Sequence, residues 1–148
     1  MSSEVSIAYI DIRVFVHATE DAEKIVKAVC NTLPTELADQ VVFRKTNLKG
    51  YYNNPIILIE ARIKKKDAVD AVFRKLASDL NKPDKELLNS EVRQHLNKGN
   101  LFIRLDKQSA YLSELKLRLD DSIHFRIHFR KSLVEEIVET CRKHGMLP

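Results

Sequence analysis

Strict alternation of apolar and polar residues is the clearest pattern in this chain, and it is most regular between Ser122 and Ser132. Because a strand points successive side chains to opposite faces, this segment predicts a strand with one apolar face and one basic face. The apolar positions are Ile123, Phe125, Ile127 and Phe129, and the positions between them are His124, Arg126, His128 and Arg130. Similar patterns predict further strands over Val5–Ala18, Val41–Gly50, Ile56–Lys64, Asn100–Lys107 and, more briefly, Leu115–Leu119.

Apolar residues spaced three or four positions apart predict the helices that lie between these strands. One helix follows Thr19, which offers an N-cap oxygen, and ends before Pro34. Others are expected over Asp67–Leu80, from about Pro83 to before Gly99, over Gln108–Leu112 as a single turn, and from Ser132 to Gly145.

The predicted order of elements is β-α-β-β-α-α-β-β-β-α, with a turn-rich hairpin loop at Gly50–Pro55. Strands that follow one another directly favour an α+β fold with a mainly antiparallel sheet, and alternation within the strands favours helices on one face only. With 148 residues, 44% of them hydrophobic, and no linker or repeat, the chain is predicted to form one α+β domain over residues 1–148.

The composition predicts a cytoplasmic protein. No apolar stretch approaches the roughly 18 residues of a membrane span, and the first residues do not resemble a signal peptide. Cys30 and Cys141 fall inside predicted helices, as free thiols of a reducing compartment usually do. The net charge of +4 is compatible with an anionic partner without requiring one.

Motifs for catalysis, cofactors and metals are not found. Three glycines are too few for a glycine-rich phosphate loop, and His124 and His128 would lie about 13 Å apart on one strand, too far to share an ion. The acids Asp11, Glu60 and Asp106 each stand two residues from an arginine. Salt bridges along or across strands are the favoured interpretation, and only convergence of the three acids around one point would support a hydrolase.

The outward strand positions suggest a basic surface with aromatic residues between the charges. Arginines can neutralise phosphates and aromatic rings can stack on bases, as in sheet-based RNA readers. Two alternatives use the same face, either as ordinary solvated surface or as a homodimer contact. The expected members are Arg13, His17, Arg44, Arg62, Lys64, Arg104, Arg126, His128 and Arg130, with Tyr9, Phe15 and Phe102 among them.

Four segments resemble an archaeal family of small proteins described as predicted exosome subunits or RNA-binding proteins. They are TEDAEKIVKAV, GYYNNPIILIEARI, LFIRLDKQSAYLSEL and the closing basic strand, and the resemblance runs from about Ile7 to Ile127. It implies a fold like that of ribosomal protein L-five and RNA-related work without a known catalytic activity. This chain has YYNNP where relatives often carry His-Gly before Asn-Pro, and Ser113 where a glycine is often found.

We therefore expect a non-catalytic RNA-binding protein that needs no cofactor and acts as an accessory factor in RNA processing or decay, in association with the exosome. The alternative is a protein–protein interaction module, such as a homodimer formed through the sheet face or an edge strand. The residues expected to contact phosphate are Arg13, Arg62, Arg104, Lys107, Arg126 and Arg130, and those expected to stack on bases are Tyr51 and Tyr52.

Overall fold

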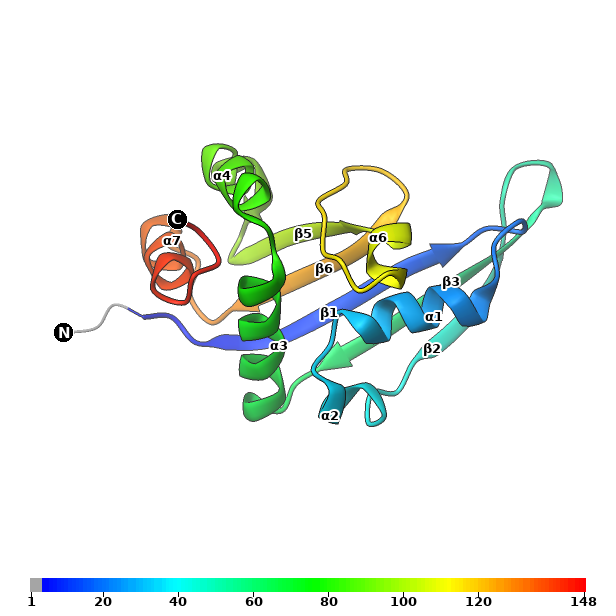
Figure 1. The fold of residues 1–148 in the computed structure, drawn as a ribbon, viewed down its shortest axis with the longest axis horizontal. Helices are drawn as coiled ribbons and strands as arrows, with labels where there is room; N and C mark the ends of the chain where they lie inside the picture. Colours follow the sequence, from blue (N-terminus) through cyan, green and yellow to red (C-terminus); the bar gives the residue numbers. More distant parts are fainter. Residues whose placement is uncertain (1–3) are drawn as a thin grey trace.

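A computed structural model describes residues 4–148 of the chain, with the side chain of Tyr51 left out. Its elements follow the predicted order closely (Figure 1). The strands are β1 (Ile7–Val16), β2 (Arg44–Lys49), β3 (Pro55–Ile63), β4 (Leu96–Asn97), β5 (Asn100–Asp106) and β6 (Ser122–Phe129). The helices are α1 (Ala22–Asn31), α2 (Thr35–Ala38), α3 (Lys66–Asp79), α4 (Lys82–Ser90), α5 (Val92–His95), α6 (Lys107–Tyr111) and α7 (Val134–Lys143), with a 3₁₀ turn η1 at Tyr51–Asn53.

Within residues 4–148 the strands form one six-stranded antiparallel sheet in the order β2-β3-β1-β6-β5-β4. The first and last long strands, β1 and β6, lie together at its centre. Helices α1, α3 and α6 lie across one face of this sheet (Figure 1). The α+β fold with a mainly antiparallel sheet is therefore confirmed.

The core lies between the helices and the inward face of the sheet. The apolar positions of the alternating segment are fully buried, with Ile123, Phe125, Ile127 and Phe129 at most 1% exposed. Helix residues such as Val72, Leu76 and Ile137 pack against this layer. Since each inward residue is apolar, the register that buries them must turn the polar residues between them to the opposite face.

The region between α3 and β5 departs from the prediction. Instead of one weak helix, it contains α4 and α5, and then β4, which pairs with the start of β5. The turn uses Lys98 and Gly99 with φ of 52° and 84°, and a Cβ on Gly99 would lie 3.2 Å from the carbonyl oxygen of Lys131. A strand of only two residues has no readable alternation, so the sequence pattern could not predict it.

Smaller differences concern element ends. The N-cap of α1 is Asp21, whose carboxylate accepts a hydrogen bond from the amide of Glu23, and not Thr19. The strand expected over Leu115–Leu119 is reduced to isolated bridges, one of which joins Leu117 to Leu105.

Both cysteines are free thiols: Cys141 is buried, which raises its pKa to about 12, and Cys30 is half-buried. Across residues 4–148, none of the helices has the length and apolarity that crossing a bilayer requires.

Candidate nucleic-acid interface

Among the described residues, five arginines and two carboxylates form a cluster on the sheet face turned away from the helices, and we call this cluster the arginine face. Its members are brought together by the register of the strands, since outward positions of neighbouring strands stand directly opposite one another. The arginine face consists of Arg13, Arg44, Arg62, Arg104 and Arg126 with Asp11 and Glu60.

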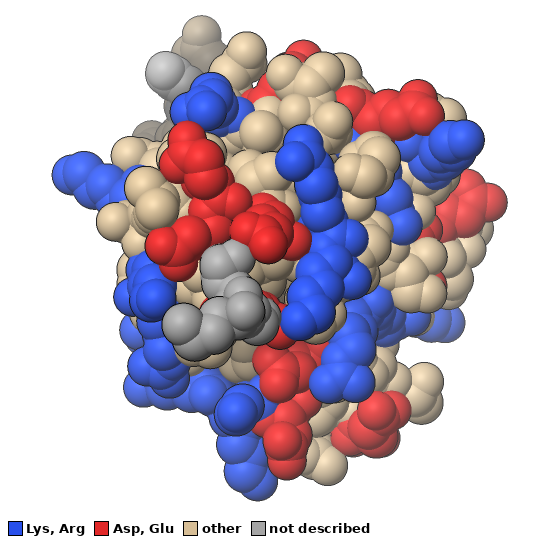
Figure 2. All heavy atoms as spheres, turned by 90° about the vertical axis from the view of Figure 1, so that its left-hand side faces the viewer, with Lys and Arg blue, Asp and Glu red and all other residues tan. Residues whose placement is uncertain are grey.

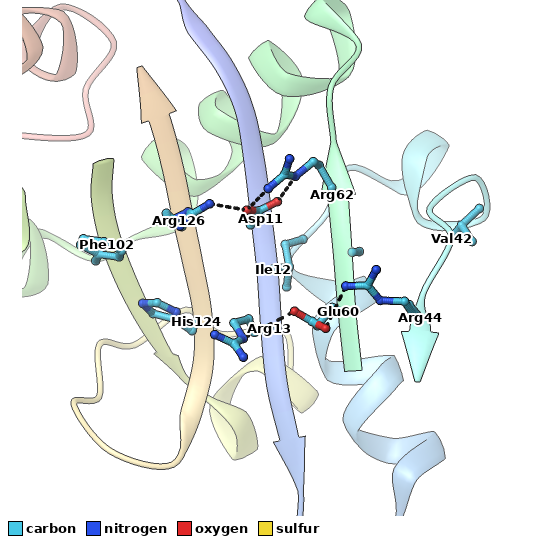
Figure 3. Close-up of a pocket in the computed structure, with 11 residues that line it drawn as sticks. Asp11, Ile12, Arg13, Val42, Arg44, Glu60, Arg62, Phe102, His124 and Arg126 are labelled. Atoms are coloured by element: carbon cyan, nitrogen blue, oxygen red, sulfur yellow. Dashed lines mark hydrogen bonds and ion pairs between the residues drawn. The ribbon is translucent and has the colours of Figure 1, made fainter. Parts of the chain in front are cut away.

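One row of the arginine face is centred on Asp11 of β1. Its carboxylate accepts two hydrogen bonds from Arg62 of β3, at 2.6 and 2.8 Å, and one from Arg126 of β6 at 3.0 Å (Figure 3). A single negative charge is thus shared by two guanidinium groups. The row continues to Phe102 of β5, which stands opposite Arg126.

A second row, two residues further along the strands, repeats this arrangement around Glu60. Arg44 of β2 donates to Glu60 Oε1 at 3.1 Å, and Arg13 Nε lies 3.7 Å from Oε2 (Figure 3). Beyond Arg13 the row continues with His124 and Arg104. Among the described residues, Arg104 has no carboxylate partner.

The arginine face therefore carries a formal surplus of three positive charges, and an open hollow of about 670 Å³ lies along it. Its charged side chains remain accessible, with Arg13 49% and Arg62 45% exposed. The end of the molecule near the N-terminus differs, because acidic and basic residues are intermixed there (Figure 2). The surplus on the sheet is thus a local property that the modest net charge of the chain does not reveal.

The aromatic residues near the centre of this face already have stacking partners. Tyr9 of β1 lies under the guanidinium of Arg62, 4.1 Å from its ring centroid, and stacks with His128 at 4.7 Å. Phe102 stacks on His124, with ring centroids 5.4 Å apart and ring planes 4° apart. These contacts order the basic side chains and leave the arginines, rather than the rings, as the groups most available to a ligand.

His124 is held neutral by its surroundings. Burial, followed by the positive charges of Arg104, Arg13 and Arg126, lowers its pKa from 6.5 to about 4. Its Nε2 atom and the Nε atom of Arg126 are buried without a hydrogen-bond partner among the described residues. From the sequence, His124 was considered only as a possible metal ligand, but the structure places it in the second row between Arg13 and Arg104.

The expected phosphate-contacting residues divide into two groups. The structure brings Arg13, Arg62, Arg104 and Arg126 together on the arginine face. Arg130 is exposed but follows the end of β6, where its amide bonds to the carbonyl of Ser6. Arg44 was not among the expected phosphate contacts, but it belongs with the first group. Its outward position in the predicted strand was the sequence feature that could have identified it.

Lys107 lies away from the arginine face, in a different environment from the one expected. It is 7% exposed, and its ammonium group donates to the carbonyl of Phe15 at 2.7 Å, to Glu20 at 3.0 Å and to Asp121 at 2.7 Å. These acceptors satisfy all three of its protons, so Lys107 has none to offer a phosphate without breaking a buried ion-pair network.

The two tyrosines expected to stack on bases sit in the turn between β2 and β3. The side chain of Tyr51 lies outside the described part of the structure. Tyr52 is 95% exposed and adopts a φ of 57°, in the left-handed region that residues other than glycine rarely occupy. Its ring makes no contribution to the core and is accessible to a partner.

The three acids considered for hydrolysis do not form one cluster. Asp11 and Glu60 each bind two arginines, whereas Asp106 caps α6 through Ser109 and pairs with Arg118 at 3.3 Å. The hydrogen bonds from Ser109, together with Arg118, hold the pKa of Asp106 below its usual value.

One group of potential metal ligands, not predicted from sequence, is formed by His17, Glu20 and Asp121, whose ligand atoms lie within 4.8 Å of one another. The ammonium of Lys107 bonds to both acids of this group and supplies the positive charge there. Asp121 is far in sequence from the other two residues, so no local spacing indicated the group. An ion could enter only by displacing Lys107.

Comparisons with known proteins identify the family of this chain. The family described as RNA binding matches residues 9–129. RNA-binding protein PAB1135 of Pyrococcus abyssi is 35% identical over 130 residues, covering 86% of this chain and 84% of the relative. Two solved structures are similar over 94% of this chain. Protein AF2318 from Archaeoglobus fulgidus has 26% identity, a TM-score of 0.79 and 99% of its own chain covered. Mth689, a DUF54 protein from Methanothermobacter thermautotrophicus, has 28% identity, a TM-score of 0.76 and 98% of its own chain covered. The chain therefore belongs to this RNA-binding family.

Proposed function

We propose that this protein binds RNA through the arginine face, mainly by contacts between guanidinium groups and phosphates. The observation that carries the proposal is the pair of cross-strand rows, in which two carboxylates are shared among four arginines and Arg104 has no acidic partner in the described chain. Guanidinium groups donate in a planar fork that suits phosphate oxygens, and a carboxylate shared by two arginines leaves donors of each exposed. Membership of an RNA-binding family supports the same assignment.

The role we infer is non-catalytic. Asp11 and Glu60, the acids nearest the proposed RNA site, are each bound by two guanidiniums, which occupy the oxygens that a general base or a metal ligand would need. Work as an accessory factor in RNA processing or decay, association with the exosome, and likeness to the fold of ribosomal protein L-five are proposals that rest on the sequence resemblance. A cytoplasmic location is a proposal that rests on the composition of the chain. Arg130 and Tyr52 belong to the proposal as peripheral contacts.

The test is a titration of labelled single-stranded RNA at several potassium chloride concentrations, with the variant Arg13→Gln/Arg44→Gln/Arg104→Gln. We expect the variant to bind more weakly and to show a shallower salt dependence. The slope of log K against log salt should decrease by about 0.7 for each phosphate that the variant no longer neutralises.

A matched control removes the same charge from the helical side of the molecule. Lys24 and Lys27 of α1 and Arg74 of α3 are exposed residues of helices on that side, and Lys24→Gln/Lys27→Gln/Arg74→Gln changes the net charge equally. This control should bind RNA almost as the wild type does. Equal decreases in affinity for both variants, or a wild type that does not bind RNA, would contradict the proposal.

The alternative of a homodimer has one structural feature in its favour, since β2 is an edge strand with both faces exposed. However, Lys45 and Lys49 on this strand are the type of residue that discourages edge-to-edge pairing. Sedimentation of the wild type over a concentration series tests this alternative. A tight dimer that loosens in the Arg13→Gln/Arg44→Gln/Arg104→Gln variant would assign the arginine face to self-association instead of RNA.

A further inference from the structure

A small cavity, which we call the edge cavity, lies beside β5 where that strand has incomplete pairing on its outer side. At one end of β5, β4 pairs with Asn100 and Leu101. At the other end, the amide of Arg118 donates to the carbonyl of Arg104 at 3.0 Å. The cavity is lined by β5, by α4 and by the segment that leads to β6, and its volume is about 130 Å³.

Most of the lining of the edge cavity is apolar. Leu87 and Leu88 of α4 and Leu117 and Leu119 contribute to it, together with Phe102 and Ile103 of β5. Two of these leucines are poorly covered by the rest of the chain, because Leu119 is 77% exposed and Leu87 46% exposed. These two leucines extend the apolar lining of the edge cavity to the solvent-exposed surface, where a ligand can contact it.

Polar groups stand at the boundary of the edge cavity. Arg104 and Arg118 line it on the side of the sheet, and Glu91 and His95, 3.4 Å apart, line it on the side of the helices. An apolar cavity with a few polar groups at its rim is the usual form of a site for a flat heterocyclic ligand. The volume suits a single ring system, since drug-sized ligands occupy about 300 Å³ or more.

We propose that the edge cavity accepts one unstacked base of the RNA that is bound to the arginine face. This inference rests on the proposed function. Two residues connect the sites: Phe102 lines both the hollow on the arginine face and the edge cavity, and Arg104 ends the second arginine row and also lines the edge cavity. A phosphate held by Arg104 therefore places its own nucleotide beside the cavity.

Charge complementarity favours a nucleotide over an apolar side chain from a protein. Arg118 is paired with Asp106 and Asp120, whereas Arg104 has no carboxylate partner in the described chain. The guanidinium of Arg104 lines the cavity, where it would repel a basic peptide and attract a sugar-phosphate backbone. The central rings of the arginine face are already stacked within the protein, so the edge cavity is the apolar surface best placed for an RNA strand that follows the arginines.

The experiment compares two RNAs with the same number of phosphates: a single-stranded oligonucleotide of mixed sequence, and the same backbone with abasic residues throughout. If only phosphates are recognised, the two bind equally. If a base enters the edge cavity, the base-containing RNA should bind at least about fivefold more tightly, because stacking one base on protein side chains strengthens binding by roughly this factor or more.

The variant Leu87→Gln/Leu119→Gln removes the exposed apolar lining without changing charge, and both positions are exposed enough to tolerate glutamine. The matched control is Leu112→Gln, since Leu112 is 62% exposed and does not line the edge cavity. We expect the ratio of the two affinities to fall toward one in the double variant and to stay at the wild-type value in the control. If the double variant does not unfold in a cooperative thermal transition, Leu119→Gln alone takes its place.

Equal binding of the two RNAs by the wild type would overturn the inference while leaving the proposed function intact. A ratio that survives in the Leu87→Gln/Leu119→Gln variant would also overturn it, because base recognition would then occur elsewhere. Failure of the wild type to bind either RNA would instead contradict the proposed function itself.

Discussion

Arg62 and Asp11 stand opposite each other on β3 and β1 and are joined by two hydrogen bonds of 2.6 and 2.8 Å. The same guanidinium lies on the ring of Tyr9, and Arg126 bonds to the same carboxylate from the other side. Asp11 thus holds two arginines in place before any ligand arrives, and at the same time subtracts one charge from the surface. These two effects on RNA binding have opposite signs.

The variant Asp11→Asn should reveal which effect is larger. Removing one unit of negative charge near a bound phosphate is worth on the order of 1 kcal/mol, so we expect RNA affinity to rise by roughly fivefold at low salt. Stability should fall by about 1 kcal/mol or less, because both ion pairs of Asp11 are partly exposed. Anisotropy titrations and urea unfolding measure the two quantities on the same preparation.

The matched control is Asp70→Asn on α3, which removes one negative charge from the helical side and should leave RNA affinity nearly unchanged. Weaker binding by Asp11→Asn than by the wild type would show the reverse order of effects. Asp11 would then act chiefly by keeping Arg62 and Arg126 in a binding geometry.

The partners of Asp11 illustrate what the sequence could and could not predict. Alternation with a period of two predicted which residues of β1, β3 and β6 face outward, since burying one face of a strand leaves no other choice. It could not predict the pairing register, and the two-residue spacing of Asp11 and Arg13 suggested them as partners as readily as any cross-strand pair. The register places Arg62 and Arg126 beside Asp11, and it places Arg13 beside Glu60.

Lys107 shows a second limit of prediction from sequence patterns. It was expected to contact phosphate and therefore to be accessible, yet it is buried against Glu20 and Asp121, which lie 87 and 14 residues away in sequence. Contacts of this kind depend on how α6 and the loops around β1 and β6 come together. No local pattern of the chain contains that information.

Lys107 should matter for stability rather than for RNA binding. The substitution Lys107→Met removes the donor that the carboxylates of Glu20 and Asp121 and the carbonyl of Phe15 share. We expect the free energy of unfolding to decrease by about 2 kcal/mol. The decrease is not larger because both carboxylates remain accessible to water. Urea unfolding measures this decrease, and RNA titration below the unfolding transition should give the wild-type affinity.

Lys116→Met is the control for this substitution. Lys116 is 57% exposed and pairs with Glu114, so its removal should cost less than about 1 kcal/mol. If Lys107→Met were as stable as this control but bound RNA more weakly, the ammonium group would belong to the binding surface after all.

His124 makes the stability of the protein depend on pH in a predictable direction. Its pKa is about 4 in the folded protein against 6.5 for an ordinary histidine, mainly because of burial and then because of three arginines. As pH falls below 6.5 the unfolded chain takes up a proton that the folded chain resists, so stability decreases between pH 6.5 and 4. The urea midpoint should therefore drop between neutral and mildly acidic pH by more in the wild type than in His124→Gln.

The variant Arg104→Gln tests whether neighbouring positive charge contributes to the lowered pKa of His124. Arg104 is the first of the three charges that lower the pKa of His124, and removing it should bring this pKa closer to 6.5. The drop in urea midpoint on acidification should then be smaller than in the wild type, although the histidine is still present. A drop of unchanged size would mean that Arg104 does not contribute to the lowered pKa of His124, which would leave burial, Arg13 and Arg126 as its causes.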